Sequence, residues 1–326
     1  MRNNQVLGNI ASECVIRIWY VDVILFIFIM VSSKEKQYNN LNKNQKIERT
    51  SDMPELPEVE TIRRVLEPQL QNRTIEKVTV NHKDAVAYPS VDDFCLGLTG
   101  QMVSHIQRRG KFLIICMKSG DRVILHLRMT GGLLFTPKNY PEEKYTHLIF
   151  HFDQGQKLLF SDMRRFGRFW FLKKEEKDTF SGIAKLGIEP FDPKLSADYL
   201  KTYLGTRKKA IKTCLLDQSI IAGIGNIYSD EILFAAKILP SRPANSLTDK
   251  EWKCLAVTIP ERLEYFIEKN AISAEDYLET KGKDYRNTPF LRIYGHSGEP
   301  CPVCGSTLCR TTIGGRSSVY CERCQQ

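Results

Sequence analysis

The chain has 326 residues, enough for two domains or for one domain with a small appendage. Its formal net charge is +9 and 10% of its residues are aromatic, a combination that favours a phosphate-rich partner. Five of its ten cysteines fall within the last 26 residues. This crowding argues against a disulfide framework and favours a reducing compartment with one metal site.

The first 52 residues do not have the pattern of a folded domain. Residues 15–31 are mostly apolar, but Arg17 and Asp22 interrupt them. Each such charge costs about 2.5–3.5 kcal/mol at the centre of a membrane span, which also needs about 20 apolar residues. Residues 34–50 are a polar tract without periodicity, typical of disorder. We expect residues 1–52 to be a non-native or disordered leader, and a membrane anchor or targeting segment is the alternative.

The sequence Met-Pro-Glu-Leu-Pro-Glu follows directly, at residues 53–58. If Met53 were the first residue and were then removed, Pro54 would carry a free secondary amine with a pKa of roughly 7.7–8.0. Such an amine can attack a sugar C1′ and form an iminium, whereas a proline nitrogen inside a chain is an amide without basicity. The alternative is that Pro57 and Glu58 simply mark the start of a helix.

A β-rich region is expected next, with one helix before it. Val59, Ile62, Leu66 and Leu70 recur near helical spacing and predict a helix over residues 57–70. From residue 74 to about residue 173, short β-branched and aromatic runs alternate with turn residues, which predicts an antiparallel sandwich or barrel. The expected strands are residues 75–80, 102–106, 112–117, 123–127, 147–152, 158–160 and 168–172.

After Gly187 the pattern becomes helical. The expected helices are residues 198–204, 211–216, 228–236, 248–270 and 274–278. They predict a second, helical domain joined to the first through the loop at residues 187–193. We therefore divide the chain into a leader (1–52), a β-sandwich domain (53–186), a helical domain (187–295) and a terminal finger (296–326).

Residues 217–231 contain the most distinctive sequence of the helical domain. Gly223 and Gly225 are expected to make tight turns with positive φ, and Asn226 is expected to cap the following helix. Backbone amides at that helix start can hold a phosphate. The segment follows a helix rather than a strand, which argues against a dinucleotide-binding fingerprint, and a simple helix–helix turn is the alternative.

Four of the terminal cysteines have the spacing of a zinc site. Cys301 and Cys304 form one pair, Cys321 and Cys324 form another, and 16 residues separate the pairs. This two-knuckle pattern predicts one zinc ion held by four thiolates, with a structural role because no coordination position is open. The residues between should form a hairpin that presents Arg316 near its tip, around Gly314 and Gly315. Cys309 lies outside both pairs and is expected to be a free thiol, with competition as a ligand as the alternative.

Taken together, these motifs resemble those of bacterial formamidopyrimidine-DNA glycosylases (Fpg, MutM) over residues 53–326. The resemblance rests on the Pro-Glu-Leu-Pro-Glu start, the zinc finger, and the motifs Arg108-Arg-Gly-Lys111, His126-Leu-Arg-Met129-Thr-Gly131, Asp162-Met-Arg-Arg-Phe-Gly167 and Gly223-Ile-Gly-Asn-Ile-Tyr228. The sister family of endonuclease VIII type, which acts on oxidised pyrimidines, usually has glycine at the position of Leu56. Leu56 therefore favours the purine-repair family.

The resemblance implies an α+β multidomain fold: an N-terminal antiparallel β-sandwich with a flanking helix, a helix-two-turns-helix domain, and a C-terminal zinc-finger β-hairpin. It also implies a bifunctional DNA glycosylase and AP lyase that excises oxidised purines (8-oxoguanine, formamidopyrimidines) and cuts the strand by β,δ-elimination. The implied partner is double-stranded damaged DNA, bound by a monomer in the bacterial cytoplasm without a membrane partner. The implied cofactor is one structural zinc ion.

Roles follow by matching position. Pro54 would be the nucleophile, Glu55 the acid that protonates the opening sugar or the leaving group, and Glu58 a supporting residue. Lys111 would act in β-elimination, and Arg316 in δ-elimination and phosphate binding. His126 and His147 are expected to be structural, because this chemistry needs no histidine base or catalytic metal.

Six further residues would contact DNA. Three of them, here called the wedge residues, would fill the gap left by an extruded base: Met129, Arg164 and Phe166. The others would contact the rest of the DNA: Tyr145, Arg207 and Asn226. Two positions depart from the family pattern, because Tyr145 stands where a DNA-contacting histidine is common and Arg128 where a small residue is. Residues 277–289 match the family's mobile loop over the flipped base, or form a plain surface connection.

Two other functions stay open on sequence alone. One is an oxidised-pyrimidine glycosylase of the sister type. The other is a DNA-binding protein without catalysis, which is the expected outcome if residues 1–52 are retained in front of Pro54, because its nitrogen would then be an amide.

Overall fold

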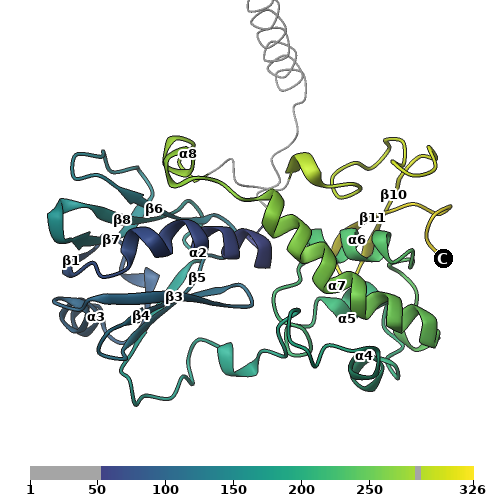
Figure 1. Ribbon diagram of the computed structural model, residues 1–326, viewed down its shortest axis with the longest axis horizontal. Helices are drawn as coiled ribbons and strands as arrows, with labels where there is room; N and C mark the ends of the chain where they lie inside the picture. The colour runs from purple at the N-terminus through teal and green to yellow at the C-terminus, as the bar shows by residue number, and fades with distance from the viewer. Residues whose placement is uncertain (1–52, 283–287) are drawn as a thin grey trace, which may run out of the picture. The chain divides into compact units, whose positions relative to one another are not determined.

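The computed structural model describes residues 53–282 and 288–326 (Figure 1). The expectations for residues 1–52 lie outside this range, as does the middle of the segment 277–289. The described helices are α2 (Leu56–Leu70), α3 (Val91–Leu98), α4 (Ala197–Leu204), α5 (Ile211–Leu215), α6 (Asn226–Ala235), α7 (Asp249–Lys269) and α8 (Ala274–Glu279). The strands are β1 (Ile75–Val80), β2 (Val86–Tyr88), β3 (Val103–Arg109), β4 (Phe112–Met117), β5 (Arg122–His126), β6 (Gly131–Thr136), β7 (Thr146–Phe152), β8 (Lys157–Asp162), β9 (Arg168–Leu172), β10 (Cys309–Ile313) and β11 (Arg316–Tyr320).

Two sheets form the β-rich region, as the sequence predicts. One has the strand order β1-β7-β8-β6 and the other the order β2-β9-β5-β4-β3. All neighbouring strands are antiparallel except β2 and β9, which pair in parallel. Phenylalanines from both sheets meet in one core, where Phe150 and Phe160 of the first sheet contact Phe169 of the second.

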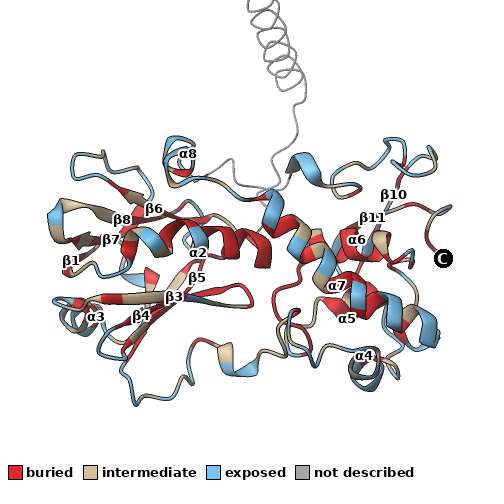
Figure 2. Cartoon of the chain, viewed as in Figure 1, coloured by how far each residue is buried: buried red, intermediate tan, exposed pale blue. Residues whose placement is uncertain are grey.

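Helix α2 packs its apolar side on the same core. Val59, Ile62 and Leu66 are all buried there, which explains the helical spacing in the sequence. Figure 2 shows α2 coloured as buried over much of its length. The helix begins with a reciprocal polar contact, because the Glu55 backbone N–H donates to Glu58 Oε2 at 3.0 Å. The predicted helix over 57–70 is therefore confirmed, one residue longer at its start.

Three elements of this region escaped prediction. Strand β6 begins with Gly131 and Gly132, residues that depress strand propensity. Strand β2 has only three residues. Helix α3 is short and contains Gly97, but Ser90 caps it by accepting the Asp93 N–H at 3.2 Å. In each case tertiary packing overrides a weak local signal.

The helical region has its own core, built mainly from α4, α6 and α7. Trp252 and Phe266 of α7 and Tyr228 of α6 are fully buried in it. Helix α7 starts at a capping box in which Thr248 and Glu251 satisfy each other's backbone amides. No helix of the described residues is long and apolar enough to cross a membrane.

Helix α8 differs from the expectation. The sequence places it in the helical domain, but Tyr277 of α8 is buried in the core of the β-sandwich. The Tyr277 hydroxyl donates to the Leu133 carbonyl of β6 at 3.0 Å. The chain therefore returns to the first domain after α7, because the apolar side of α8 finds its partners on β6 and α2.

Candidate active site

Three segments far apart in the chain meet around Glu55. The close approach is visible at Gly225, where a Cβ atom would lie 2.2 Å from Glu55 Oε1 and 2.4 Å from Lys111 Nζ. Both side chains are therefore packed against the backbone of Gly225. Glycine is required there because any side chain would displace one of the two charged groups.

The carboxylate of Glu55 also occupies the amino end of α6. The Ile227 N–H donates to Glu55 Oε1 at 3.0 Å, and the Tyr228 N–H donates to Glu55 Oε2 at 3.3 Å. A negative charge at this end of a helix is favoured by the helix dipole and by unpaired amides. Glu55 thus takes the place that a phosphate or a capping side chain would otherwise fill.

Two expectations for this turn are wrong. Asn226 does not cap α6, because it is the first helical residue and Gly225 is the N-cap. Its Nδ2 instead donates to the Tyr294 hydroxyl at 3.3 Å, and its buried Oδ1 accepts no hydrogen bond from the described part of the chain. Gly223 does have positive φ (95°), but Gly225 is extended, so it serves close approach rather than a turn.

Burial changes the acidity of both charged groups. Burial raises the pKa of Glu55 to about 7, although the nearby Lys111 ammonium lowers it in part. Burial likewise lowers the pKa of Lys111, and repulsion from Arg316 lowers it further, against the attraction of Glu55. The site therefore holds a carboxyl group that can carry a proton near neutral pH beside a lysine whose pKa lies below its ordinary value.

This raised pKa predicts a pH-dependent stability. An acid with a pKa of 4.5 unfolded and about 7 folded binds more protons when folded, so its contribution is complete below pH 4.5 and is lost as pH rises through 7. At about 1.4 kcal/mol per pKa unit the loss reaches about 3 kcal/mol. We expect urea unfolding of Glu55→Gln to lack this part of the pH dependence. Parallel curves for both proteins between pH 4.5 and 7.5 would contradict the shift.

Glu58 supports the site from the first turn of α2. One of its oxygens accepts the Glu55 N–H, and the other accepts a hydrogen bond from the Tyr228 hydroxyl. Glu58 and Tyr228 are both buried. The start of α2 and the start of α6 are thus held together on both sides of Glu55.

The turn that carries Lys111 is fixed by Glu189, a residue that the sequence analysis missed. Glu189 Oε1 accepts the Gly110 N–H at 2.7 Å and an Arg109 guanidinium N–H at 2.8 Å, and Oε2 accepts from Arg108 at 2.6 Å. Glu189 lies in the segment between the two domains. Its acidic charge beside a Pro in a loop gave no signal of this role.

Arg316 lies at the start of β11, on the hairpin predicted from the cysteine spacing. Its side chain is exposed, and its positive charge contributes to the lowered pKa of Lys111. The hairpin is held by a buried ion pair, since Lys212 Nζ contacts Asp230 Oδ1 at 2.7 Å and also donates to the Ser317 carbonyl at 2.9 Å. Asp230 in turn accepts the Ser318 hydroxyl at 2.7 Å.

A second acid on α6 holds the segment before the finger. Glu231 Oε1 accepts the backbone N–H groups of Ile293 and Tyr294 at 2.9 and 3.0 Å. Helix α6 and the β10–β11 hairpin accordingly lie side by side (Figure 1). Sequence reasoning missed Lys212, Asp230 and Glu231, because charged residues inside a helical pattern read as solvent-facing.

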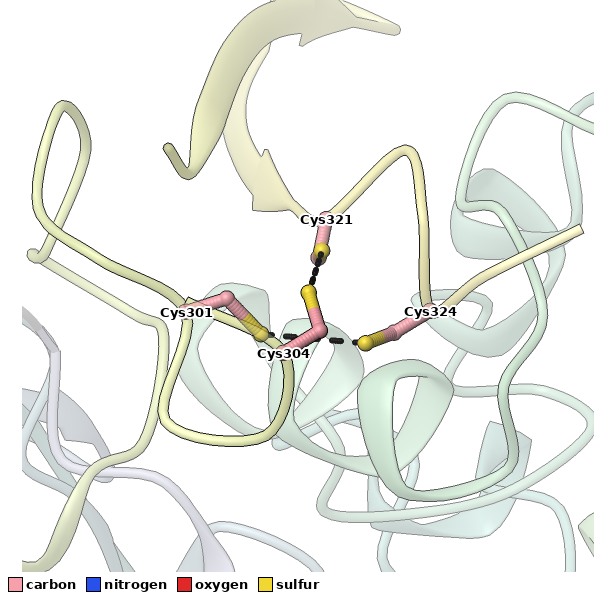
Figure 3. A group of neighbouring side chains, drawn as sticks. All are labelled: Cys301, Cys304, Cys321 and Cys324. Atoms are coloured by element: carbon pink, nitrogen blue, oxygen red, sulfur yellow. Dashed lines mark hydrogen bonds between the residues drawn. The ribbon is translucent and has the colours of Figure 1, made fainter. Parts of the chain in front are cut away.

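The four paired cysteines converge as predicted, and their side chains point toward one another (Figure 3). Their sulfur atoms all lie within 4.8 Å of one another, with Cys301 and Cys324 3.8 Å apart and Cys304 and Cys321 3.5 Å apart. Tetrahedral zinc with Zn–S bonds of about 2.3 Å requires sulfur separations of about 3.8 Å. The cluster therefore suits one structural zinc ion, and Cys309 is not part of it.

The three wedge residues come from two neighbouring loops, residues 127–130 and 163–167. An Arg164 guanidinium nitrogen lies 2.8 Å from Met129 Sδ, so the two loops touch. The Phe166 ring is 51% exposed although it is large and apolar. The structure thus brings the loops of the wedge residues together at the surface. Packing in the core does not explain the position of the Phe166 ring.

The remaining predicted DNA contacts are less uniform. Arg207 is turned toward the protein, with Nη1 2.9 Å from Asp217 Oδ2, while the neighbouring Lys208 and Lys209 are exposed. Tyr145 is exposed, and Lys144 Nζ lies 5.6 Å from the centre of its ring. The ammonium of Lys144 therefore supplies a positive charge close to Tyr145, whose own side chain carries none.

The two histidines have structural contacts. His126 is buried beside Phe112, accepts the Arg128 N–H at Nδ1 (3.0 Å), and has its pKa lowered to about 3 by burial and by Arg128. His147 Nε2 donates to the Asp162 carbonyl at 2.7 Å. Both rings thus make packing or hydrogen-bond contacts within the β-sandwich.

Comparison with known proteins follows the same division of the chain. Residues 53–169 match the model of the formamidopyrimidine-DNA glycosylase N-terminal domain, residues 186–277 the H2TH domain of the same glycosylases, and residues 298–326 a zinc finger found in FPG and IleRS. The chain is 42% identical over 275 residues to a formamidopyrimidine-DNA glycosylase of Desulforamulus reducens, covering 84% of this chain and 99% of the relative. It is 44% identical over 256 residues to that of Moorella thermoacetica, covering 78% and 93%.

Solved structures agree. A complex of Lactococcus lactis Fpg (MutM) with DNA containing an oxidised pyrimidine has a TM-score of 0.75 and 33% identity, covering 84% of this chain and 100% of that one. A complex of the same protein with DNA containing N7-benzyl-Fapy-dG gives the same values. The chain belongs to the family of formamidopyrimidine-DNA glycosylases, which are DNA-repair glycosylases.

Proposed function

We propose that this glycosylase binds damaged duplex DNA as a monomer, excises oxidised purines and cuts the strand at the resulting abasic site. The observation that carries the proposal is the buried pair of Glu55 and Lys111, which packs against Gly225. Glu55 directly follows Pro54 in the chain. A protonatable carboxyl, a lysine of lowered pKa and a proline at the same place provide the groups that base excision through an imine needs.

The proposed reaction begins at Pro54 with a free amine. Its lone pair attacks C1′, the C1′–N bond to the base breaks, and the base leaves with a proton. Glu55, protonated near neutral pH, donates a proton to the opening sugar or to the leaving base. The C1′–O4′ bond then breaks, and the proton of the attacking amine goes to whichever of O4′ and the base Glu55 has not protonated, so that the sugar is joined to Pro54 as an iminium. Loss of a C2′ proton breaks the C3′–O bond and expels the 3′ phosphate by β-elimination.

Lys111 and Arg316 are proposed to act in the later steps. The lowered pKa of Lys111 supports a role in taking or giving a proton during β-elimination. Arg316 carries an exposed guanidinium that repels the Lys111 ammonium. We propose that this guanidinium binds the phosphate expelled by δ-elimination. Glu58 is proposed to orient Glu55 through the backbone contact described above.

Contacts to the DNA are proposed for the wedge residues and for Tyr145, Arg207 and Asn226. For Arg207 the ion pair with Asp217 would have to open, so we add Lys208 and Lys209, which are exposed beside it. Asn226 is the first residue of α6, whose next backbone N–H donates to Glu55, and the Asn226 Nδ2 donates to the Tyr294 hydroxyl. Phosphate contacts of this kind position the protein without reading sequence.

Release of damaged bases tests the proposal. Purified protein with a free Pro54 amine is expected to release 8-oxoguanine and formamidopyrimidine from duplex oligonucleotides faster than thymine glycol, with strand cleavage following. Preferential release of thymine glycol would instead support the oxidised-pyrimidine alternative. The Lactococcus lactis complex with an oxidised pyrimidine makes that comparison necessary.

The wedge provides a separate prediction. Phe166→Ala is expected to lose stacking worth about 1–3 kcal/mol and so to slow excision from duplex DNA about tenfold or more. Cleavage of a preformed abasic site should change less, because less unstacking remains to be done. Phe180→Ala is the matched control, since Phe180 is equally exposed but stacks on Tyr88 of β2 and belongs to neither wedge loop. Equal losses of Phe166→Ala on both substrates would contradict the wedge role.

A further inference from the structure

Asp162 is the last residue of β8 and precedes the loop that carries two wedge residues. It is only 1% exposed, yet no cation pairs with it among the described residues. Its carboxylate is directed instead at the wedge loop, where Oδ1 accepts the Arg164 N–H at 3.1 Å and Oδ2 accepts the Gly167 N–H at 2.8 Å. The carboxylate thus holds both ends of the segment 164–167.

The same carboxylate reaches the second wedge loop through Thr130. The Thr130 hydroxyl donates to Asp162 Oδ1 and accepts the Arg164 N–H at 3.0 Å. Thr130 directly follows Met129. One buried acid therefore joins the loop of Met129 to the loop of Arg164 and Phe166.

Backbone conformation shows that the two loops are held against local preference. Arg128 and Arg165 have φ of 58° and 59°, in the left-handed region that residues with a side chain rarely adopt. Each lies directly beside a wedge residue, before Met129 and between Arg164 and Phe166. Such conformations persist only where surrounding contacts impose them. The bonds of Asp162 to Arg164 and Gly167 enclose Arg165. Arg128 donates its N–H to His126 Nδ1, and Thr130, two residues later, is bonded to Asp162.

Space around the loop leaves little freedom for rearrangement. A Cβ atom at Gly167 would lie 2.4 Å from Phe160 Cζ and 3.3 Å from Asp162 Oδ2. The segment therefore ends against the sandwich core at a fixed point, and Phe166, the residue before it, projects outward.

We propose that Asp162, acting with Thr130, is the positioning residue that sets the wedge residues in their DNA-inserting arrangement before DNA is bound. The inference rests on the proposed function for the wedge, but it concerns a residue that would not itself touch DNA. Pre-organisation lowers the ordering cost of binding, so its loss should appear in the extrusion step rather than in the later chemistry.

The test compares Asp162→Asn with the unchanged sequence, both as protein that begins at Pro54 with a free amine. An amide offers one acceptor and two donors, so it cannot accept from both the Gly167 side and the Thr130 and Arg164 side. We expect excision of 8-oxoguanine from duplex DNA to slow about tenfold, while cleavage of a preformed abasic site changes less than about threefold. Fluorescence of 2-aminopurine beside the lesion reports base unstacking without any chemistry, and its rise on binding should become smaller.

Two further variants keep the test independent of stability. Thr130→Val removes the hydroxyl that links the loops and should reproduce the defect, whereas Thr130→Ser keeps the hydroxyl and should restore near-normal excision. Asp178→Asn is the matched control, because the Asp178 carboxylate also accepts two backbone N–H groups, from Phe180 and Ser181, in another loop of the same domain. It should leave both excision and fluorescence unchanged.

The outcomes separate this inference from the proposed function. A normal fluorescence rise and normal excision with Asp162→Asn and Thr130→Val would overturn the positioning role. Equal slowing on intact and abasic substrates would also overturn it. An unchanged protein that unstacks lesion DNA but never cleaves it would overturn the proposed chemistry, while the fluorescence of the variants would still decide the role of Asp162.

Discussion

Protein that begins at Met53 and loses that methionine is expected to be trapped on DNA containing 8-oxoguanine by borohydride, whereas the 326-residue form is not. Borohydride reduces an iminium between Pro54 and C1′ to a stable amine. In the longer form the Pro54 lone pair is delocalised into an amide, and no side-chain movement restores its basicity. The yield of trapped complex should therefore differ by several orders of magnitude, as it does when a nucleophile is lost.

The start of the family match supports this design, because the N-terminal domain model begins at residue 53. Pro57→Ala in the shorter form is the matched control, since Pro57 lies in the first turn of α2 and has no proposed chemical role. It should still be trapped. Efficient trapping of a chain shown by mass spectrometry to begin at Met1 would refute the assignment of Pro54 as the nucleophile.

Loss of zinc is expected to have the second largest effect. Structural zinc contributes about 10–16 kcal/mol to the folding of small fingers, so Cys301→Ser or a chelator should disorder the region around β10 and β11. The buried Lys212–Asp230 pair would then lose its contacts to Ser317 and Ser318. With Arg316 no longer held in place, DNA affinity should fall about tenfold or more and strand cleavage should fall with it.

Zinc content, DNA affinity by fluorescence anisotropy, and hydrogen exchange of the β-sandwich together check this result. The sandwich should keep its protection, because its core shares no residue with the finger. Cys309→Ser is the matched control, since Cys309 belongs to the same hairpin but not to the sulfur cluster. Zinc-free protein that binds and cleaves normally would show that the metal has no such role.

Local patterns in the sequence were enough for most of the secondary structure. The predicted bounds of β1, β4 and β9 agree with the structure at both ends, because polar residues or glycine stand on both sides of their β-branched and aromatic runs. The zinc ligands followed from spacing alone. Strand β6 was not predicted, because its two leading glycines are typical of turns. Pairing with β8 makes them strand residues.

The candidate site was only partly visible in the sequence, for a physical reason. Glu189 acts on Arg108, 81 residues away in the chain, and Asp230 acts on Ser318, 88 residues away. The role of a buried acid depends on the donors that folding brings to it, and no local pattern encodes those donors. The raised pKa of Glu55 is a product of burial, which the attraction of Lys111 offsets only in part, so it could not be read from the residues 53–58.

Helix α6 makes the acidity of the site depend on the finger. Its first turn donates to Glu55, and Asp230, farther along the same ten-residue helix, binds the strand that carries Arg316. Arg316 in turn lowers the pKa of Lys111 by repulsion. A finger that swings away would remove this repulsion, so the proton-transfer role proposed for Lys111 is tied to the position of the hairpin that carries Arg316.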